Sequence, residues 1–353
     1  MQSYKMVAFG RPLERATQPV PIPTDAAAVV RIGSSGVCHS DLHVWEGSFD
    51  LGGGRALDFK PNLTLPHTLG HEIAGEVIDV GPAARLVSVG ERCVVYPWIG
   101  CGRCSRCESS EEHLCAAPRS LGTRTNGGFA DHVLVPHERY LVPYGGVREE
   151  FACTLPCSGL TSYAALRKAA PFSDRDPLLV IGAGGVGFSA IRLAATLHGV
   201  HPWVAEIDRK KWDAARAAGA REMIDPREEG TAKRVLAATG GFAAVVDFVG
   251  ASETASFGMS VLRKGGRLVL VGLFGGALTL SLPLLPLRAI SLIGSFVGSL
   301  AEFRELMDLA RAGKLKEIPV EVRPMTEAQK TLDDLKGGRV LGRVVLKPTA
   351  AIS

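Results

Sequence analysis

The chain has 353 residues, a length for which two domains are the reasonable expectation. Its 40 basic and 36 acidic residues leave a net charge of +4 without any basic run, which argues against a nucleic-acid or membrane-surface partner. The N-terminus has no apolar signal segment and no apolar stretch is long enough to span a membrane, so we expect a cytoplasmic protein whose eight cysteines bind metal instead of forming disulfides.

The first part of the chain is predicted to hold short strands followed by a segment dense in reactive groups. Residues 27–32 form the clearest strand, and residues 36–43 read Gly-Val-Cys-His-Ser-Asp-Leu-His. Ser40 and Asp41 are typical of a capped helix start. A helix cap does not require a cysteine and two histidines within six residues, so the segment also indicates metal binding or proton transfer.

Residues 44–68 are predicted to form a loop, because three consecutive glycines at 52–54 and Pro61 interrupt regular structure. Trp45 and Phe49 in this loop either line a pocket or anchor the loop, and the sequence leaves both interpretations open.

The next segment, residues 69–77, places a histidine beside a glutamate and between glycines at the start of an apolar, β-rich run. The helical zinc-protease pattern is excluded, because it requires a second histidine at position 75, where this chain has Gly75. Together with Cys38 upstream and Cys157 downstream, His71 can form a three-ligand zinc site whose fourth position is open for chemistry.

Four cysteines follow in a short lobe. Cys101, Cys104 and Cys107 are separated by two-residue gaps, and Cys115 follows eight residues later. Four thiolates at this spacing predict a closed tetrahedral zinc site. Because such a site has no open coordination position, its role should be structural.

Residues 127–135 resume a strand, and a helix is predicted to begin just after Cys157. The positive field at the N-terminus of a helix favours a thiolate at that cysteine.

From residue 177 the pattern changes to alternating strands and helices. A buried strand, residues 177–181, runs into Gly182-Ala183-Gly184-Gly185-Val186-Gly187 and an apolar helix that reaches about residue 198. Glu206 ends the next strand, 19 residues after the last glycine of the motif. This is the full dinucleotide fingerprint, in which the glycines admit the pyrophosphate and Glu206 accepts hydrogen bonds from the adenosine ribose. We therefore expect NAD to be preferred over NADP.

The remaining elements complete two domains. Strands are predicted at 244–249, 267–271 and 289–293, with helices at 210–218 and 252–262 between the strands. The tail is predicted to hold helices at 302–312 and 326–335 and strands at 318–322 and 342–346. Such a tail can return to the first domain. We therefore divide the chain into residues 1–155 with 300–353, the catalytic zinc-binding domain, and residues 156–299, the NAD-binding domain.

Together these motifs resemble those of zinc-dependent medium-chain alcohol dehydrogenases, and the likeness covers nearly the whole chain. It is carried by residues 36–41, by Gly-His-Glu at 70–72, by the four-cysteine lobe, by Cys-Ser-Gly at 157–159 and by the glycine motif. The chain is most similar to tetrameric microbial and archaeal members. The resemblance implies an α/β fold with a Rossmann doubly wound parallel sheet and a mainly β, GroES-like catalytic domain.

The resemblance also assigns roles to individual residues. Cys38, His71 and Cys157 would hold the catalytic zinc, Asp41 would orient His71, and Glu72 would be a carboxylate near the metal. Ser40 and His43 would form a proton relay, and Trp98 would line the substrate pocket. Thr161 and the 271–273 segment, with Val271 and Leu273, would contact the nicotinamide. Arg343 would contact the pyrophosphate and Lys211 the adenosine ribose.

Two features distinguish this chain within that family. His39 stands where many members carry an arginine against the pyrophosphate, so we expect coenzyme binding to weaken as the pH rises through the pKa of the imidazole. The vertebrate-type insertion after the four-cysteine lobe is absent, which favours a homotetramer. Of the other two cysteines, Cys93 is expected in a strand core and Cys153 as a small buried hydrophobic residue.

We therefore predict an NAD-dependent alcohol dehydrogenase with two zinc ions per chain. It would transfer hydride reversibly between primary or secondary alcohols, aromatic and cyclic ones included, and aldehydes or ketones.

A polyol dehydrogenase is the nearest alternative, although such relatives often have glutamate where this chain has Cys157. A zinc-free quinone reductase should lack Cys38 and the four-cysteine lobe. Ser40 and His43 argue against a non-catalytic NAD-sensing zinc protein.

Overall fold

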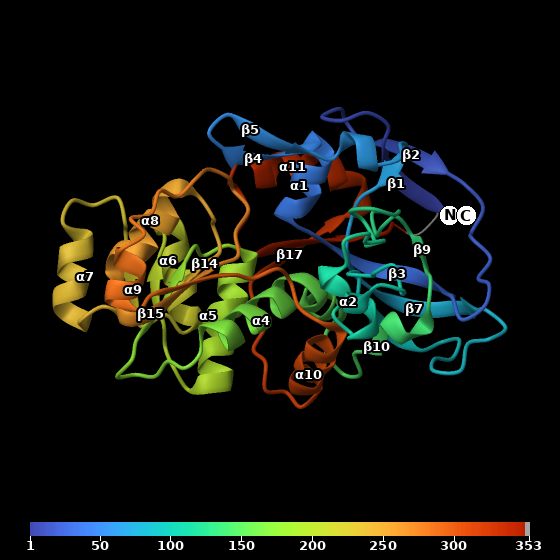
Figure 1. Ribbon diagram of the computed structural model, residues 1–353. Helices are drawn as coiled ribbons and strands as arrows, with labels where there is room; N and C mark the ends of the chain where they lie inside the picture. Colours follow the sequence, from blue (N-terminus) through green and yellow to red (C-terminus); the bar gives the residue numbers. More distant parts are fainter. Residues whose placement is uncertain (350–353) are drawn as a thin grey trace. The chain divides into compact units, whose positions relative to one another are not determined.

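The computed structural model describes residues 1–349, which pack into two compact units (Figure 1). The first unit comprises Met1–Ser48, Asp58–Leu160 and the chain from Gly298 onwards, and the second comprises Phe49–Leu57 and Thr161–Val297. The functional division made from the sequence, at residues 155 and 300, stays a prediction. Among the described residues, no helix combines the length and the apolarity that a membrane crossing requires.

The main sheet of the first unit has seven strands. Its path runs in the order β10 (Leu141–Pro143), β8 (Arg92–Val95), β7 (Glu72–Val80), β3 (Ala28–Val37), β18 (Arg343–Lys347) and β17 (Val320–Pro324), and β9 (His132–Val135) pairs with β3 beside this path. The C-terminal strand β18 lies antiparallel to β3, with Val345 opposite Gly36. The tail of the chain therefore returns to the first unit, as the sequence predicted.

The first unit also contains a small sheet and short helices. The sheet has the order β2 (Glu14–Thr17), β1 (Gln2–Met6) and β6 (His67–Thr68). The helices are α1 (His39–Glu46), α2 (Ser105–Glu108), α3 (Glu149–Ala152), α10 (Leu300–Arg311) and α11 (Ala328–Lys336). One hydrophobic cluster joins α1, α11 and the sheets and includes Trp45, Leu69, Phe129 and Leu332. Trp45 is buried and its indole N–H donates to Arg11 O (2.7 Å), so this side chain anchors its segment.

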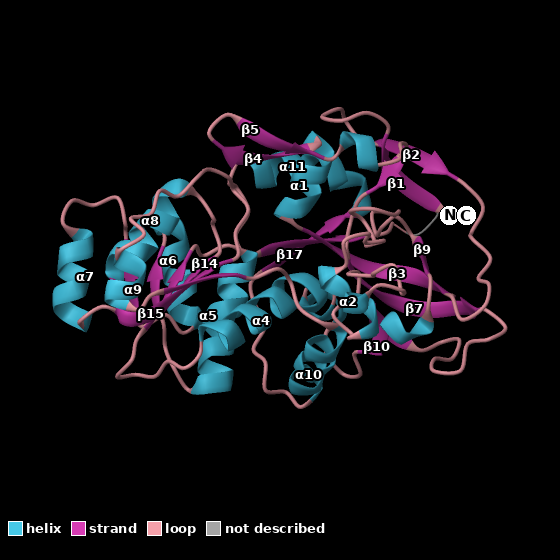
Figure 2. Ribbon diagram, in the orientation of Figure 1, coloured by secondary structure: helices cyan, strands magenta, loops and turns pink. Residues whose placement is uncertain are grey.

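The second unit contains a parallel sheet of six strands among helices (Figure 2). The strand order is β13 (Glu222–Ile224), β12 (Trp203–Ala205), β11 (Leu178–Ile181), β14 (Phe242–Asp247), β15 (Leu262–Leu270) and β16 (Ser291–Gly294). The helices are α5 (Gly185–His198), α6 (Trp212–Ala218), α7 (Thr231–Thr239), α8 (Ser252–Val261) and α9 (Leu284–Arg288), and α4 (Leu160–Ala169) begins at the unit boundary. Every residue of β11 and β14 is buried, as expected of central strands covered on both faces.

The predicted loop at residues 44–68 is wrong. Helix α1 continues to Glu46, and β4 (Ser48–Gly52) pairs with β5 (Arg55–Asp58) as a hairpin. The three glycines do not break the structure, because all three have positive φ values and so form the tight turn of the hairpin. Residues 49–57 pack with the second unit, where the backbone of Gly52 lies against Gly276.

Candidate active site

The first candidate ligand, Cys38, lies at the junction of β3 and α1. It is the N-cap of α1 and has extended backbone angles (φ −122°, ψ 158°). Asp41 Oδ2 accepts a hydrogen bond from Cys38 N (2.8 Å), and Asp41 N donates to Cys38 O (3.0 Å). Asp41 therefore caps the helix, as its position in the sequence indicated, and it also fixes the backbone of a candidate metal ligand.

The same carboxylate orients the second candidate ligand. Asp41 is fully buried, and its Oδ1 accepts hydrogen bonds from Gly70 N and His71 Nδ1, each at 3.1 Å. Burial by itself lowers the pKa of His71, but the charge and hydrogen bond of Asp41 raise this pKa well above its usual range. The buried Nε2 of His71 has no hydrogen-bond partner within residues 1–349. This arrangement is typical of a metal-binding histidine, whose other ring nitrogen is held by a carboxylate.

The third candidate ligand, Cys157, lies in a π-helical turn, Leu155–Gly159, that leads into α4. The sequence predicted a plain helix start at this point. A π-helical turn has wider hydrogen-bond spacing than an α-helix and is frequent at functional sites. Cys157 Sγ lies 3.9 Å from Cys38 Sγ. Two sulfurs bound to one tetrahedral zinc ion are about 3.8 Å apart, so the observed spacing fits that metal.

The three candidates and Glu72 form one cluster. Their possible ligand atoms all lie within 4.8 Å of one another, and all four residues are buried. The hydrogen bond with Cys157, together with the positive charges of Arg343 and His71, lowers the pKa of Cys38 well below its usual range, which favours a thiolate. Two sulfurs and an unpartnered imidazole nitrogen are a donor set that zinc prefers. The residues therefore fit the metal that the sequence predicted.

Glu72 pairs with Arg343 beside this cluster. The two side chains are buried, and Arg343 Nη2 lies 3.2 Å from Glu72 Oε1, while Arg343 Nη1 donates to Val37 O (3.1 Å). Burial raises the pKa of Glu72 to about 7, although the charge of Arg343 opposes the shift. The carboxylate lies against Gly36, where a Cβ would stand 2.1 Å from Glu72 Oε2. The predicted pyrophosphate contact of Arg343 is not tested, and the contacts observed here are with Glu72 and Val37.

The four-cysteine lobe forms a second, separate cluster. The sulfurs of Cys101, Cys104, Cys107 and Cys115 lie within 4.8 Å of one another, with Cys104 Sγ 3.5 Å from Cys107 Sγ and 3.7 Å from Cys115 Sγ. The N–H of Arg103 lowers the pKa of Cys101 to about 6. Gly100 is required next to this cluster, because a Cβ there would lie 2.4 Å from Cys107 Sγ. The four sulfurs fit the closed zinc site that their spacing predicted.

The glycine motif connects β11 to α5 in the second unit. Gly182 has a φ of 92°, and Gly184 is the N-cap of α5. Gly187 must lack a side chain, because a Cβ at that position would lie 1.9 Å from Gly182 O. Gly185 and Val186 form the first turn of α5, so N–H groups of the helix start are available to an anion.

Glu206 follows β12 and lies next to this motif. Its side chain is 7% exposed, Oε2 accepts a hydrogen bond from Ala183 N (2.8 Å) and Oε1 accepts one from Asp208 N (2.8 Å). Lys211 Nζ lies 3.8 Å from Glu206 Oε2. Each carboxylate oxygen can accept a second hydrogen bond, so the ribose contact predicted for Glu206 is compatible with this geometry.

Comparison with known proteins agrees with both halves of this description. Residues 24–145 match the alcohol dehydrogenase GroES-like domain, and residues 185–312 match the zinc-binding dehydrogenase family. The NAD-dependent alcohol dehydrogenase of Sulfurisphaera tokodaii is 37% identical, over 99% of this chain and 100% of that protein. The D-arabinose 1-dehydrogenase (NADP(+)) of Saccharolobus solfataricus is 30% identical, over 96% and 95%. The crystal structure of the Aeropyrum pernix alcohol dehydrogenase has a TM-score of 0.89 at 27% identity, over 99% and 100%. This chain belongs to the zinc-binding alcohol dehydrogenase family.

The residues that this alcohol dehydrogenase family would use for proton transfer lie on α1. Ser40 is half-buried, and its Oγ lies 4.0 Å from Cys38 Sγ. His43 lies one turn further along the helix, where burial and the charge of His39 lower its pKa. His39 is exposed in the first turn of α1. The two proton-relay roles and the coenzyme role of His39 stay predictions.

The two aromatic candidates for the substrate pocket differ in their surroundings. Trp98 is buried, its indole N–H donates to Pro156 O (2.9 Å), and its ring centroid lies 5.3 Å from that of His71. It therefore lies beside the candidate metal ligands. Phe49 lies in β4, in the segment that packs with the second unit. The pocket role of each residue stays a prediction.

The candidates for coenzyme contacts lie at several points of the second unit. Thr161 is buried in the first turn of α4. Val271 is half-buried and its N–H donates to Asp247 O (2.9 Å), whereas Leu273 is exposed. Their contacts with the nicotinamide, and that of Lys211 with the ribose, stay predictions.

Gly36 contributes to the site and was not predicted from the sequence. This glycine makes room for the Glu72 carboxylate, although the two residues are far apart in the chain. A glycine inside a strand often marks a close approach of another group, which is the signal that could have indicated it.

Proposed function

We propose that this protein catalyses the reversible, NAD-dependent oxidation of alcohols to aldehydes or ketones. The single observation that carries the proposal is the unpartnered, buried Nε2 of His71 beside the paired sulfurs of Cys38 and Cys157. That donor set occurs in a chain whose second unit has the glycine motif of a dinucleotide site. Zinc would polarise the alcohol oxygen and NAD would accept the hydride when both are bound.

The side chains of this protein would orient the ligands and move the proton. Asp41 holds the ring of His71 so that Nε2 faces the two sulfurs. Ser40 Oγ would accept the proton of the alcohol and release it toward His43. Since burial and His39 lower the pKa of His43, its imidazole is neutral near neutral pH and can accept a proton.

The test combines metal analysis with turnover. The unmodified protein should contain two zinc ions per chain, one for each cluster, and should produce NADH with members of a panel of primary, secondary, aromatic and cyclic alcohols. Cys38→Ser should abolish turnover and remove one zinc ion without unfolding the protein. Full activity with a single zinc ion per chain would refute the assignment of two zinc sites.

The same panel separates the alternatives. Polyols and D-arabinose belong in it, because a sugar dehydrogenase is among the relatives. Preferred turnover of polyols would favour the polyol dehydrogenase, although Cys157 in the third ligand position argues against it. Absence of turnover with every alcohol and aldehyde would favour a non-catalytic NAD-sensing protein.

We also propose that the protein is a cytoplasmic homotetramer. The exposed leucines of this region support the tetramer. Leu292 is exposed on the edge strand β16, and Leu284 and Leu287 are exposed on α9, which precedes β16 in the chain. An exposed edge strand without lysine or proline is a ready site for pairing with a second copy.

A further inference from the structure

Two carboxylates, the buried Glu72 and the partly buried Glu149, lie against glycines of the same strand, β3. Glu72 occupies the space where Gly36 would carry a side chain, at the metal end of the strand. Glu149 does the same at Gly33, where a Cβ would lie 2.3 Å from Glu149 Oε1. The pairing register of β3 with β7 shifts between Ile32 and Ser34, so Gly33 lies at an irregularity of the strand. The second contact fixes Glu149 against the backbone of β3 just as the first fixes Glu72.

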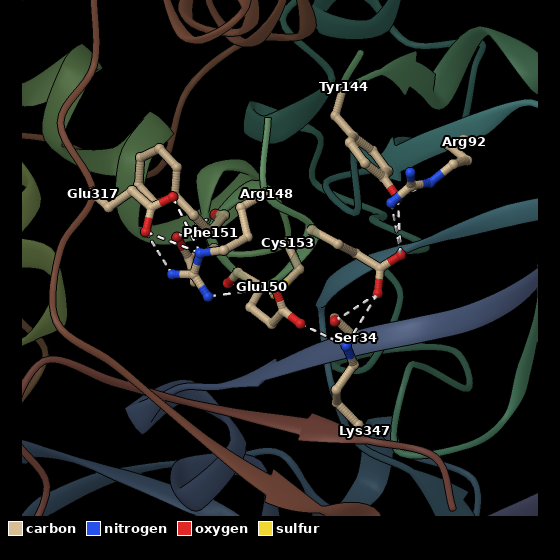
Figure 3. A network of polar contacts seen from close by, with 11 residues as sticks. Ser34, Arg92, Tyr144, Arg148, Glu150, Phe151, Cys153, Glu317 and Lys347 are labelled. Atoms are coloured by element: carbon tan, nitrogen blue, oxygen red, sulfur yellow. Dashed lines mark hydrogen bonds and ion pairs between the residues drawn. The ribbon is translucent and has the colours of Figure 1, made fainter. Parts of the chain in front are cut away.

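Hydrogen bonds hold the Glu149 carboxylate in that position. Oε1 accepts from Ser34 Oγ (2.9 Å), and Oε2 accepts from Tyr144 Oη (2.8 Å). Lys347 Nζ and Arg92 Nη2 lie further away, at 4.0 and 3.8 Å. Glu149 itself is only 17% exposed, whereas Arg92 and Lys347 are 59% and 41% exposed, so the hydrogen bonds from Ser34 and Tyr144 are the principal restraints on its carboxylate. We call Glu149 with these four partners the Glu149 network; Figure 3 labels the partners Ser34, Tyr144, Arg92 and Lys347.

The Glu149 network is continuous with the segment that carries Cys157. Helix α3 begins at Glu149, Cys153 N donates to Glu149 O (2.9 Å), and the π-helical turn Leu155–Gly159 follows two residues later. Glu150, Cys153 and Cys157 follow one another at intervals of three and four residues along this helical run. A π-helical turn lacks the regular α-helical hydrogen bonds, so its position depends on how its flanks are anchored.

Strand β18 connects the same two sites. Lys347 Nζ forms an ion pair with Glu150 Oε1 (2.5 Å), as Figure 3 shows, and Arg343 pairs with Glu72 at the metal cluster. The two cations are four residues apart on β18, so they point to the same face of the strand. The helical run therefore extends from the Glu149 network to Cys157 in the metal cluster. Strand β18 likewise extends from Lys347 near Glu149 to Arg343 beside the metal cluster.

We propose that Glu149 is a positioning residue for the metal centre. Its contact with Gly33, Ser34 and Tyr144 fixes the start of the helical run, and this sets the position of Cys157 Sγ relative to Cys38 Sγ. The consequence is slower loss of the metal held by Cys38, His71 and Cys157. The inference rests on the zinc site of the proposed function.

The experiment measures release of each zinc ion to a chelator, pyridine-2,6-dicarboxylate, in the full-length protein. Replacing a group that orients a metal ligand typically weakens metal affinity by about 10–100-fold. Glu149 acts one step further from the metal, so in Glu149→Ala we expect the zinc held by Cys38, His71 and Cys157, here called the first zinc, to be released roughly 10-fold faster. The zinc of the four-cysteine lobe should be released at an unchanged rate. Glu149→Gln keeps one oxygen acceptor and should show a smaller effect. Cobalt substituted at the Cys38 site should show a shifted absorption band in Glu149→Ala.

The matched control is Glu317→Gln. Arg148 and Glu317 form an ion pair (2.6 Å) in the same region, which Figure 3 labels, but both side chains are about half exposed and no hydrogen bond of Glu317 with β3 is present among the described residues. This variant should release both zinc ions at the unmodified rate.

Equal release rates in folded Glu149→Ala and in the unmodified protein would overturn the inference, and so would equally accelerated loss of both zinc ions. If Glu149→Ala does not fold, Ser34→Ala and Tyr144→Phe each remove one of the two hydrogen bonds, and unchanged release of the first zinc from both would overturn it as well. An unmodified protein without zinc at Cys38, His71 and Cys157 would instead refute the proposed function.

Discussion

We predict that Glu206 sets the coenzyme preference through its single carboxylate. Two unit charges about 4 Å apart at an effective dielectric near 20 repel by about 4 kcal/mol, and this repulsion would act on the 2′-phosphate of NADP. Solvent screening reduces the effect, so we expect kcat/KM to favour NAD by about tenfold to a few hundredfold. The nearby cations offer NADP little compensation, because Lys211 lies beside Glu206 itself and Arg209 pairs with Glu228 (2.5 Å).

The variant Glu206→Ala should narrow this ratio, measured as kcat/KM for both coenzymes. Activity with NAD should also fall, because Ala183 N and Asp208 N lose their acceptor. Asp213→Asn, which changes an exposed carboxylate on α6, is the control and should leave the ratio unchanged. Equal or better use of NADP by the unmodified enzyme would contradict the role of Glu206.

His67 should make stability depend on pH. It is 2% exposed, its Nε2 lies 3.0 Å from Gly122 O, and burial lowers its pKa. The unfolded chain therefore binds a proton at His67 more readily than the folded chain does. The stabilisation is complete above the unfolded pKa of about 6.5 and decreases as the pH falls below it. The free energy of unfolding should drop more steeply from about pH 7 to 5 in the unmodified protein than in His67→Gln, as urea titrations can show. Parallel curves would exclude His67 as the cause.

At the residue scale, the sequence predicts side chains whose chemistry is tied to a short spacing. The four cysteines of the lobe and the glycine motif are examples, since each set is nearly contiguous. Glu149 could not be found in this way. Its partner Ser34 is 115 residues away, and a glutamate at a helix start is common on any protein surface.

Among the elements, the four-cysteine lobe should contribute stability and no chemistry. It contains only short helical turns, α2 and the 3-10 turn Glu112–Leu114, which cannot hold their geometry without a common centre. Cys104→Ser should therefore remove several kcal/mol of folding free energy, which corresponds to a fall in Tm of roughly 10 °C or more. Cys38→Ser should lower Tm less and abolish activity. A Tm in Cys104→Ser that equals that of the unmodified protein would disprove a structural role for the lobe.

Strands and helices with a strong apolar period were predicted well, and the irregular elements were not. The central strands β11 and β14 and the helix of the glycine motif follow from buried runs, whereas the short strand β13 of the same sheet was not predicted. The hairpin of β4 and β5 was missed because its residues are mostly exposed, so no alternation of burial marks it. The π-helical turn at Cys157 was missed because it depends on tertiary contacts of its flanks and has no sequence signal of its own.

For the whole molecule, assembly is the property to test. Leu292→Lys places a charge on the exposed edge strand β16, so it should reduce the proposed tetramer to smaller species in light scattering. Leu86→Lys, the same substitution at an exposed leucine of the first unit, should leave the mass of the assembly unchanged. A monomeric unmodified protein, or a tetramer that persists in Leu292→Lys, would disprove the assembly through β16.

The hairpin also determines how this protein can be divided. Residues 49–57 belong to the second unit by their contacts, although they precede the rest of it by about one hundred residues of chain. In that unit the backbone of Gly52 covers Gly276, and Asp50 lies against Gly275. A gene fragment encoding residues 161–297 would therefore yield a coenzyme-binding unit without the hairpin, so the backbone of Gly275 and Gly276 would be uncovered. Expressing the hairpin as a separate peptide together with that fragment should restore the missing cover, so binding of the peptide by the fragment would measure this contact on its own.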